Sequence, residues 1–148
     1  KQRELEAALE RELAVLPNIP LADASDRLDL HDLITDHLCL IVASIYCEPC
    51  FQALTNLHAF LQEETSLNFA IILESDQEGY ELVSRHFLGL APVYRKSRLE
   101  IQRELRAKGA PWGYGIDENG TIVTSHVCSE TEDLIQLALP FRRSVEAS

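Results

Sequence analysis

The sequence predicts one α/β domain with a mixed central sheet and helices on both faces. Residues 38–45 form a nearly continuous apolar run, which is typical of a strand that is covered on both faces. Further strand-like segments alternate with helical ones, and residues 117–120 (Asp-Glu-Asn-Gly) are a hairpin signal that adds antiparallel strands. With 148 residues, 46% of them apolar, the chain is long enough to bury one core.

The expected elements follow in order from the N-terminus. Leucines at helical spacing in residues 1–16 predict an amphipathic helix that Pro17 ends. After the buried strand, a helix begins inside Cys47-Glu48-Pro49-Cys50 and runs to about residue 64. The remaining elements are a strand at 68–73, a helix at 77–87, a short strand at 92–94, a helix at 97–108 closed by Gly109, hairpin strands at 112–116 and 121–127, and a last helix opened by a capping box at 129–132.

Residues 1–17 are expected to form either a surface helix or a stalk, and residues 18–148 to form the α/β domain. The chain starts at Lys1 without a methionine or a signal sequence, so we expect an N-terminal membrane anchor or targeting segment to have been lost. No apolar run approaches the roughly 18–20 residues that span a bilayer. We expect an extracytoplasmic protein, periplasmic or membrane-anchored, while a cytoplasmic location stays open.

Charge and cysteine content narrow the classes of function. The net charge of −11 argues against a nucleic-acid partner, because Lys and Arg drive binding to phosphates. Four cysteines are too few for a disulfide scaffold in a domain of this size. The Cys-x-x-Cys supplies half of a tetrahedral zinc site, and no second pair follows it. Redox chemistry is therefore the better interpretation of Cys47 and Cys50, without a metal or a bound cofactor, since the thiols carry the electrons.

The placement of Cys47 and Cys50 predicts a division of roles. Cys47 falls at the N-terminus of the expected helix, where free backbone N–H groups and the helix dipole favour a thiolate. Pro49 suits the first turn, which needs no N–H donor at that point. Cys50 lies on the next turn, within reach of a mixed disulfide formed by Cys47. We expect Cys47 to be the attacking thiol and Cys50 the resolving thiol, and the net effect of the Glu48 carboxylate stays open.

Two blocks of sequence carry a resemblance to a known family. They are Cys47-Glu48-Pro49-Cys50 after its strand, and Gly109-Ala110-Pro111 before residues 112–123. Together they resemble the TlpA/ResA-like thiol–disulfide oxidoreductases of the thioredoxin superfamily, over about residues 18–141. The resemblance implies a thioredoxin-like fold in which a cis proline faces the Cys-x-x-Cys, and Pro111 matches that proline. The substrate-binding residues that it implies are Tyr46, Glu48, Pro49, Ala110 and Pro111, with the Ala110 backbone pairing with the partner.

The sequence also departs from that family. Tyr46 stands where relatives often have Trp, and Ala53 stands where related reductases commonly carry Glu. Residues 40–44 contain no counterpart of the buried Asp of thioredoxin. The acids left to accept a proton from Cys50 are Glu74 and Glu48, if either reaches the site. The direction of exchange, reduction or oxidation, stays open.

Three further residues outside the Cys-x-x-Cys need an interpretation: Cys39, Cys128 and His126. Cys39 opens the motif strand, so we expect it at the far end of the sheet from Cys47, as a small buried hydrophobic residue. Cys128 ends the last strand near the groove; a structural cysteine is the default, and a third redox thiol is the alternative. We expect no disulfide between Cys39 and Cys128, because they should lie at opposite ends of the sheet. His126 is the one histidine to consider as a copper ligand.

The sequence thus predicts thiol–disulfide exchange between the Cys-x-x-Cys and cysteines of a protein substrate. An upstream redox partner protein would reset the pair after each cycle. The alternative is a redox-inert or copper-binding thioredoxin-fold module that acts in protein assembly.

Overall fold

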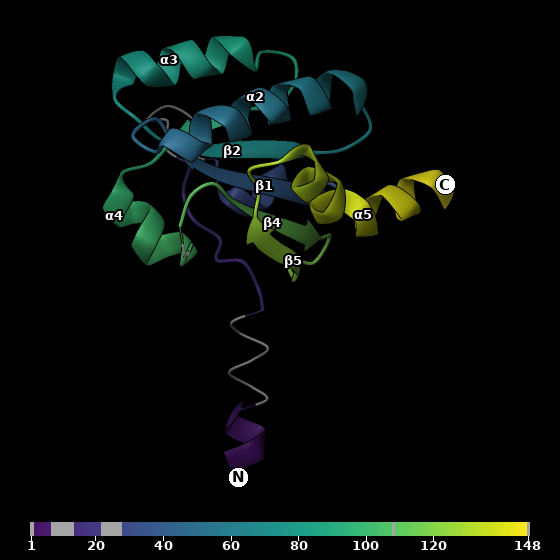
Figure 1. Cartoon of the computed structure of the whole chain (residues 1–148). Helices are drawn as coiled ribbons and strands as arrows, with labels where there is room; N and C mark the ends of the chain where they lie inside the picture. The colour runs from purple at the N-terminus through teal and green to yellow at the C-terminus, as the bar shows by residue number, and fades with distance from the viewer. Residues whose placement is uncertain (1, 7–13, 22–27, 108, 148) are drawn as a thin grey trace.

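The computed structural model describes residues 2–6, 14–21, 28–107 and 109–147, and its centre is a five-stranded sheet (Figure 1). The strand order is β3-β2-β1-β4-β5. Strands β1, β2 and β3 run parallel to one another, whereas β4 is antiparallel to both β1 and β5. The predicted mixed sheet is therefore confirmed. The strands are β1 (His37–Ser44), β2 (Phe69–Glu74), β3 (Val93–Arg95), β4 (Trp112–Asp117) and β5 (Ile122–Val127).

Helices cover both faces of this sheet, as predicted. One core cluster joins the sheet to three helices, which Figure 1 shows above and beside it. They are α2 (Glu48–Glu63), α3 (Gln77–His86) and α5 (Thr131–Ala147). The second cluster, on the opposite face, joins the sheet to the segment before β1 and to the short helical segment before β4. These contain the 3-10 turn η1 (Leu30–Leu33), the single turn α4 (Arg98–Glu100) and the π-helical turn η2 (Ile101–Leu105).

Strand β1 lies at the middle of the sheet, and all of its residues are buried. Its side chains alternate between the two core clusters. Cys39, Ile41 and Ala43 face α2 and α5, while Leu38, Leu40 and Val42 face the other layer. The strand covered on both faces, which the apolar run predicted, is therefore confirmed. Because β1 is fixed from both sides, the residues that follow it emerge at a well-defined edge of the sheet.

The expected N-terminal helix is only partly confirmed. Residues 2–6 are helical, and residues 7–13 of that prediction lie outside the described part of the chain. The prediction is wrong at its end, because Val15 forms an antiparallel bridge with Thr121 and the Leu16 N–H donates to the Gly120 carbonyl at 2.9 Å. Leu16 is fully buried in the second core cluster. Burial of this side chain, together with backbone partners at the start of β5, overrides the helical spacing of the leucines.

The helix expected at 97–108 also ends early. A Ser97–Glu100 capping box starts α4 as predicted by helical propensity, but the chain then widens into the π-helical turn η2. Arg106, at a left-handed φ of 54°, terminates it rather than Gly109. The Tyr114 hydroxyl donates to the Leu105 carbonyl at 2.8 Å, so that carbonyl is satisfied from the sheet and not by another helical turn.

Two local details of the C-terminal half differ from expectation. The hairpin is present, but only Gly120 of Asn119-Gly120 has a positive φ (83°), because the turn is a three-residue loop closed by Asp117 and Thr121. At the start of α5 the cap is supplied by Asp133, whose carboxylate accepts the N–H groups of Ser129 and Glu130 at 3.1 and 3.0 Å. The capping box expected at 129–132 is replaced by this one.

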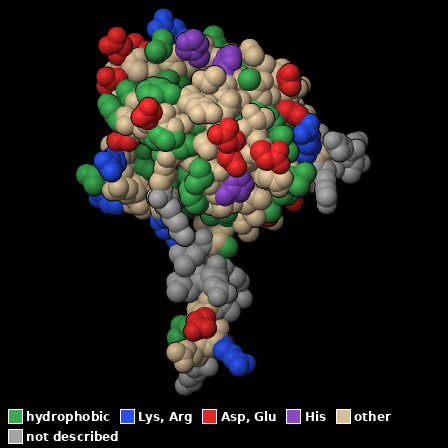
Figure 2. Space-filling model, in the orientation of Figure 1, with side chains coloured by type: hydrophobic (Ala, Val, Ile, Leu, Met, Phe, Trp, Pro, Cys, Tyr) green, Lys and Arg blue, Asp and Glu red, His purple; other side chains and the backbone are tan. Residues whose placement is uncertain are grey.

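The surface agrees with the acidic composition. Figure 2 shows red Asp and Glu side chains spread over the visible face, and the blue Lys and Arg side chains form no broad basic patch on it. Within the ranges that the structure describes, no helix combines the length and the apolar character needed to cross a bilayer.

Candidate functional site

The Cys-x-x-Cys lies at the junction between the end of β1 and the start of α2. Cys47 is the N-cap residue of α2, with extended backbone angles (φ −113°, ψ 115°), and Pro49 occupies the first turn. The Cys50 N–H already donates to the Cys47 carbonyl at 3.1 Å. This local structure follows from the sequence: the buried strand ends at Ser44, and a proline is tolerated at a helix start because no N–H donor is needed there. The predicted strand–motif–helix order is confirmed.

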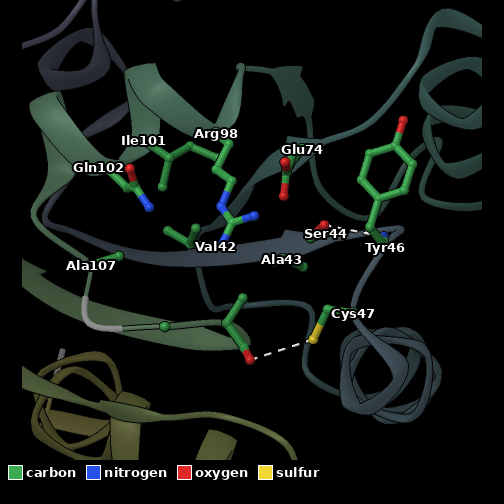
Figure 3. A pocket seen from close by; sticks show the side chains of 12 residues that line it. Val42, Ala43, Ser44, Tyr46, Cys47, Glu74, Arg98, Ile101, Gln102 and Ala107 are labelled. Carbon is green, nitrogen blue, oxygen red and sulfur yellow. Dashed lines mark hydrogen bonds between the residues drawn. The ribbon is translucent and has the colours of Figure 1, made fainter.

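The thiol of Cys47 faces the segment before β4. It is half-buried, and its S–H donates to the Ala110 carbonyl oxygen at 3.4 Å (Figure 3). The peptide bond between Ala110 and Pro111 is cis, as the resemblance implied. Ala110 is exposed, whereas Pro111 is buried. The fold therefore brings together the two blocks of sequence that were singled out, and it leaves the Ala110 backbone accessible beside the sulfur of Cys47.

Cys50 has a different environment from Cys47. Its side chain is fully buried, and its sulfur accepts the Ser44 N–H at 3.4 Å. Burial, reinforced by a hydrogen bond with Cys47, raises the pKa of Cys50 to about 12. Cys50 is thus held as a thiol at neutral pH. The pair consists of one accessible sulfur and one sequestered sulfur, which is the asymmetry that sequential attack and resolution require.

The other predicted contact residues surround Cys47 at the surface. Tyr46 is 67% exposed, and Glu48 and Pro49 are exposed as well. The Tyr46 N–H donates to the Ser44 hydroxyl at 3.1 Å, which fixes the chain between the strand and the helix. In Figure 3 the Tyr46 ring projects outward from this turn. These three side chains are therefore placed where a partner that approaches Cys47 would meet them.

Of the two acids considered for Cys50, Glu74 is the one whose charge acts on the Cys50 thiol. It ends β2 and pairs in register with Ser44, while the Ile45 N–H donates to its carbonyl at 3.0 Å. Its negative charge contributes, as the smallest of several causes, to the raised pKa of Cys50. Among the described residues the Glu74 carboxylate makes no hydrogen bond to the Cys50 sulfur. Ala53, in the position where related reductases carry an acid, is buried in the core.

A cleft of about 480 Å³ opens beside Cys47. Its floor is the end of β1, and its walls come from the end of β2, from α4 and η2, and from the segment before β4. The residues that line it are Val42, Ala43, Ser44, Tyr46, Cys47, Glu74, Arg98, Ile101, Gln102, Ala107, Gly109 and Ala110. Sequence reasoning missed Arg98 and Gln102. Their spacing of four residues in a helical segment just before Ala110 was the available signal, but it does not say which way that face points.

The remaining cysteines are structural in their surroundings. Cys128 is 1% exposed, and its N–H donates to the Pro111 carbonyl at 3.2 Å, so it does lie near the groove. Burial raises its pKa to about 12. Cys39 is fully buried, opposite Gly115 in the sheet, and burial with a smaller contribution from Cys128 raises the pKa of Cys39 far above its usual range. Although their backbones are separated along the sheet, both thiols face the same core cluster, which the prediction of opposite ends did not anticipate.

His126 lies beside Cys128. The Cys128 sulfur lies 3.7 Å from the His126 Nδ1, which also contacts the Val127 carbonyl at 3.0 Å. In the described part of the chain, no three His, Cys, Asp or Glu side chains come together in a way that would hold a metal ion.

The fold and the site define a class: a thioredoxin-like domain with a Cys-x-x-Cys at the strand–helix junction and a cis proline beside it. No protein-family model and no curated protein sequence matches the chain. Solved structures do. The thioredoxin domain of a thiol-disulfide oxidoreductase from Bacteroides vulgatus shares 17% identity at a TM-score of 0.65, covering 86% of this chain and 94% of that chain.

Two other solved structures are similar. A thiol:disulfide interchange protein from Bacteroides sp. shares 18% identity at a TM-score of 0.64, with 86% of this chain and 88% of that chain covered. A secreted thiol-disulfide isomerase from Corynebacterium glutamicum shares 17% identity at a TM-score of 0.58, with 85% and 82% covered. At these identities the similarity establishes the fold. The thioredoxin-like fold that the sequence resemblance implied is confirmed.

Proposed function

We propose that the protein is a thiol–disulfide oxidoreductase that exchanges the Cys47–Cys50 disulfide with cysteines of a protein substrate. The observation that carries the proposal is the pairing of an accessible Cys47 thiol, 3.4 Å from the exposed Ala110 carbonyl, with a fully buried Cys50. The fold that this chain shares with thiol:disulfide interchange proteins supports it.

Cys47 and Cys50 divide the exchange into two steps. The Cys47 thiolate attacks one sulfur of a substrate disulfide; a Cys47–substrate disulfide forms, and the departing substrate sulfur takes up a proton. The Cys50 sulfur then loses its proton and attacks Cys47, which forms the Cys47–Cys50 disulfide and releases the second substrate thiol. Two electrons pass from the protein dithiol to the substrate. The reverse sequence oxidises a substrate dithiol, and no further cofactor takes part.

The contact surface of a substrate would be built around the cis proline. The Ala110 backbone, exposed beside Cys47, is the proposed pairing edge for an extended segment of the partner, and Pro111 holds it in place. Tyr46, Glu48 and Pro49 would contact the partner from the opposite side of the sulfur. An upstream redox partner protein would use the same surface to reset the pair.

We also infer an extracytoplasmic location. Disulfide exchange with structural cysteines belongs to oxidising compartments, and thiols in the cytosol are kept reduced. The structural similarity to a secreted thiol-disulfide isomerase supports the same inference. Fractionation of cells that express the complete protein checks it, because a purely cytosolic fraction would contradict it.

Three variants, each with one cysteine replaced, test the proposed function. Reduced wild-type protein should cleave a protein disulfide, Cys47→Ser should lose this activity, and Cys50→Ser should accumulate a mixed disulfide that dithiothreitol releases. Cys39→Ala is the matched control, because Cys39 lies near the start of β1, whereas Cys47 and Cys50 follow the end of that strand. Full activity in Cys47→Ser, or a Cys50→Ser variant that forms no adduct, would overturn the proposal.

A further inference from the structure

The cleft beside Cys47 contains two side chains of opposite charge that no other described residue pairs with. Arg98 enters it from α4 and Glu74 from the end of β2, and Figure 3 shows the guanidinium and the carboxylate directed toward the same space above β1. Neither side chain forms an ion pair or a hydrogen bond with another described residue. Charged groups of opposite sign that share a cleft and are not bonded to each other leave both sites free for a ligand.

This situation contrasts with the other charges on the same segment. Lys96, two residues before Arg98, is buried and lies 3.5 Å from the Glu100 carboxylate and 3.2 Å from that of Glu104. The segment therefore has acids available, and they are engaged by Lys96 instead of by Arg98. Arg98 is left exposed toward the cleft, where Glu74 is half-buried.

The size of the cleft and its position restrict what it can hold. At about 480 Å³ it falls in the range of small-molecule sites and exceeds the space that a single side chain fills. Cys47 and Ala110 form one part of its wall, so a ligand inside the cleft has access to the Cys47 sulfur. A ligand with one charge would pair with one of the two side chains and be repelled by the other. A zwitterion satisfies both.

We propose that this cleft binds the α-amino-acid end of a low-molecular-weight disulfide of the cystine or glutathione disulfide type. The carboxylate pairs with Arg98, the ammonium pairs with Glu74, and one sulfur of the ligand lies against Cys47. Gln102, which also lines the cleft and is exposed, supplies an amide that can donate to the carboxylate or accept from the ammonium. The proposal rests on the exchange chemistry proposed for Cys47 and adds a substrate class to it.

The reaction balances without any further reactant. The Cys47 thiolate attacks the bound disulfide, a mixed disulfide forms, and one aminothiol leaves and takes up a proton. Cys50 then loses its proton and attacks Cys47, releasing the second aminothiol. The dithiol is oxidised by two electrons, and the small disulfide is reduced by two.

The test is one turnover of pre-reduced protein with a set of small disulfides that differ in charge. Cystine and glutathione disulfide both carry the zwitterionic α-amino-acid group, to which glutathione disulfide adds one glycine carboxylate on each half. Cystamine is cationic, dithiodiglycolate is anionic, and bis(2-hydroxyethyl) disulfide is neutral. Each rate is divided by the rate of the same disulfide with free dithiothreitol, which removes differences in intrinsic reactivity. The expected result is a normalised rate that is highest for the zwitterionic disulfides, and the comparison of cystine with glutathione disulfide separates the two sources of this head group.

Two charge-neutralising variants assign the contacts. Arg98→Gln and Glu74→Gln should each lower the ratio of the cystine or glutathione disulfide rate to the neutral disulfide rate by roughly threefold to tenfold. Arg98→Gln should remove mainly the discrimination against cystamine, and Glu74→Gln mainly the discrimination against dithiodiglycolate. Arg103→Gln and Glu78→Gln are matched controls outside the cleft, on η2 and α3.

Each outcome decides between the inference and its alternatives. Equal normalised rates for all the disulfides, or charge variants that leave the ratio unchanged, would refute the zwitterion site while Cys47-dependent exchange with the neutral disulfide remains. A variant that slows every disulfide equally would also refute it, because the side chain would then act on the thiols and not on the ligand. Loss of Cys47 dependence for the neutral disulfide would instead refute the proposed function itself.

Discussion

The Cys47 thiol donates a hydrogen bond to the Ala110 carbonyl oxygen, 3.4 Å away and 63 residues further along the chain. The contact joins the N-cap of α2 to the residue before the cis proline. It exists only while Cys47 keeps its proton, since a thiolate or a disulfide sulfur has no hydrogen to donate. Formation of a mixed disulfide therefore frees the Ala110 carbonyl at the moment when a partner's backbone is close enough to pair with it.

The two thiols should differ in alkylation by iodoacetamide. At pH 7 we expect rapid labelling of the half-buried Cys47 in Cys50→Ser and very slow labelling of Cys50 in Cys47→Ser, because burial, the largest cause of the raised pKa of Cys50, remains in that variant. Below that pKa the thiolate fraction grows about tenfold per pH unit, so the Cys50 rate should still be rising between pH 7 and pH 10. Peptide mass mapping measures both sites. A rate for Cys50 that levels off below pH 9 would contradict this environment.

Close packing at Gly113 predicts a large effect of one methyl group. A Cβ there would lie 2.4 Å from the Cys128 sulfur and 2.9 Å from a methyl carbon of Leu137. We expect Gly113→Ala to lower the free energy of unfolding by about 1–3 kcal/mol through overpacking. Urea denaturation measures this, with Gly109→Ala as the control, because no atom of a described residue other than its chain neighbours lies within 4 Å of a Cβ at that position. Equal stability of the two variants would show that the core yields more easily than the structure indicates.

The hydrogen bond between Asp36 and His37 should contribute to the free energy of unfolding in a way that acid removes. The His37 Nδ1–H donates to the Asp36 carboxylate at 2.8 Å, and this hydrogen bond holds the pKa of Asp36 below its usual value. The hydrogen bond therefore adds to the free energy of unfolding above the unfolded pKa of about 3.9, and this contribution is lost as the pH falls through the lower folded pKa. Asp36→Asn should therefore be less stable than wild type at pH 7 by under about 1 kcal/mol, since Asp36 is mostly exposed.

The test of this pair is the pH dependence of the difference. Urea denaturation of wild type and Asp36→Asn should give free energies that converge between pH 4 and pH 2. Glu118→Gln, at the exposed hairpin turn, serves as a control with no such convergence. A difference that stays constant down to pH 2 would mean that the hydrogen bond does not depend on the charge of Asp36.

Lys96 should be the side chain that anchors the segment carrying the cleft wall. It is only 4% exposed, and its ammonium lies between the Glu100 and Glu104 carboxylates. Lys96→Met should lower the free energy of unfolding by about 1–3 kcal/mol, because it leaves Glu104 without its buried cation. The double variant Lys96→Met/Glu104→Leu should recover most of the loss. Denaturation of the four members of this cycle measures the coupling, and additive effects would disprove it.

The parts that the sequence predicted well are those where local pattern and long-range packing agree. Residues 38–45 carry apolar side chains on both faces, and the strand is buried on both faces. Cys47 and Pro49 have local preferences that suit a helix start, and they occupy one. The placement of Pro111 opposite the motif followed from the resemblance and not from any local pattern.

The parts that the sequence missed are decided by contacts between distant segments. The helical spacing of residues 1–16 fails at Leu16 because Gly120, in the hairpin turn before β5, provides its backbone partner. The helix after Ser97 ends at Arg106 because Tyr114, from β4, captures the Leu105 carbonyl. Arg98 and Glu74 line one cleft because β2 and α4 come together there. The spacing of residues along the chain does not predict which distant segments come together.

The cleft wall and the site of bond exchange are neighbours along one stretch of chain. Ala107 and Gly109 line the cleft, and Ala110 follows with the carbonyl that receives the Cys47 thiol. A ligand in the cleft whose affinity differs between the dithiol and the disulfide form would link occupancy of the cleft to the oxidation state of Cys47, and thermodynamic linkage is reciprocal. A ligand that binds the reduced protein tenfold more tightly than the oxidised one raises the reduction potential of the pair by about 30 mV. For such a ligand, the reduction potential of the Cys47–Cys50 pair depends on how much of the protein has its cleft occupied. That potential therefore changes with the concentration of the ligand.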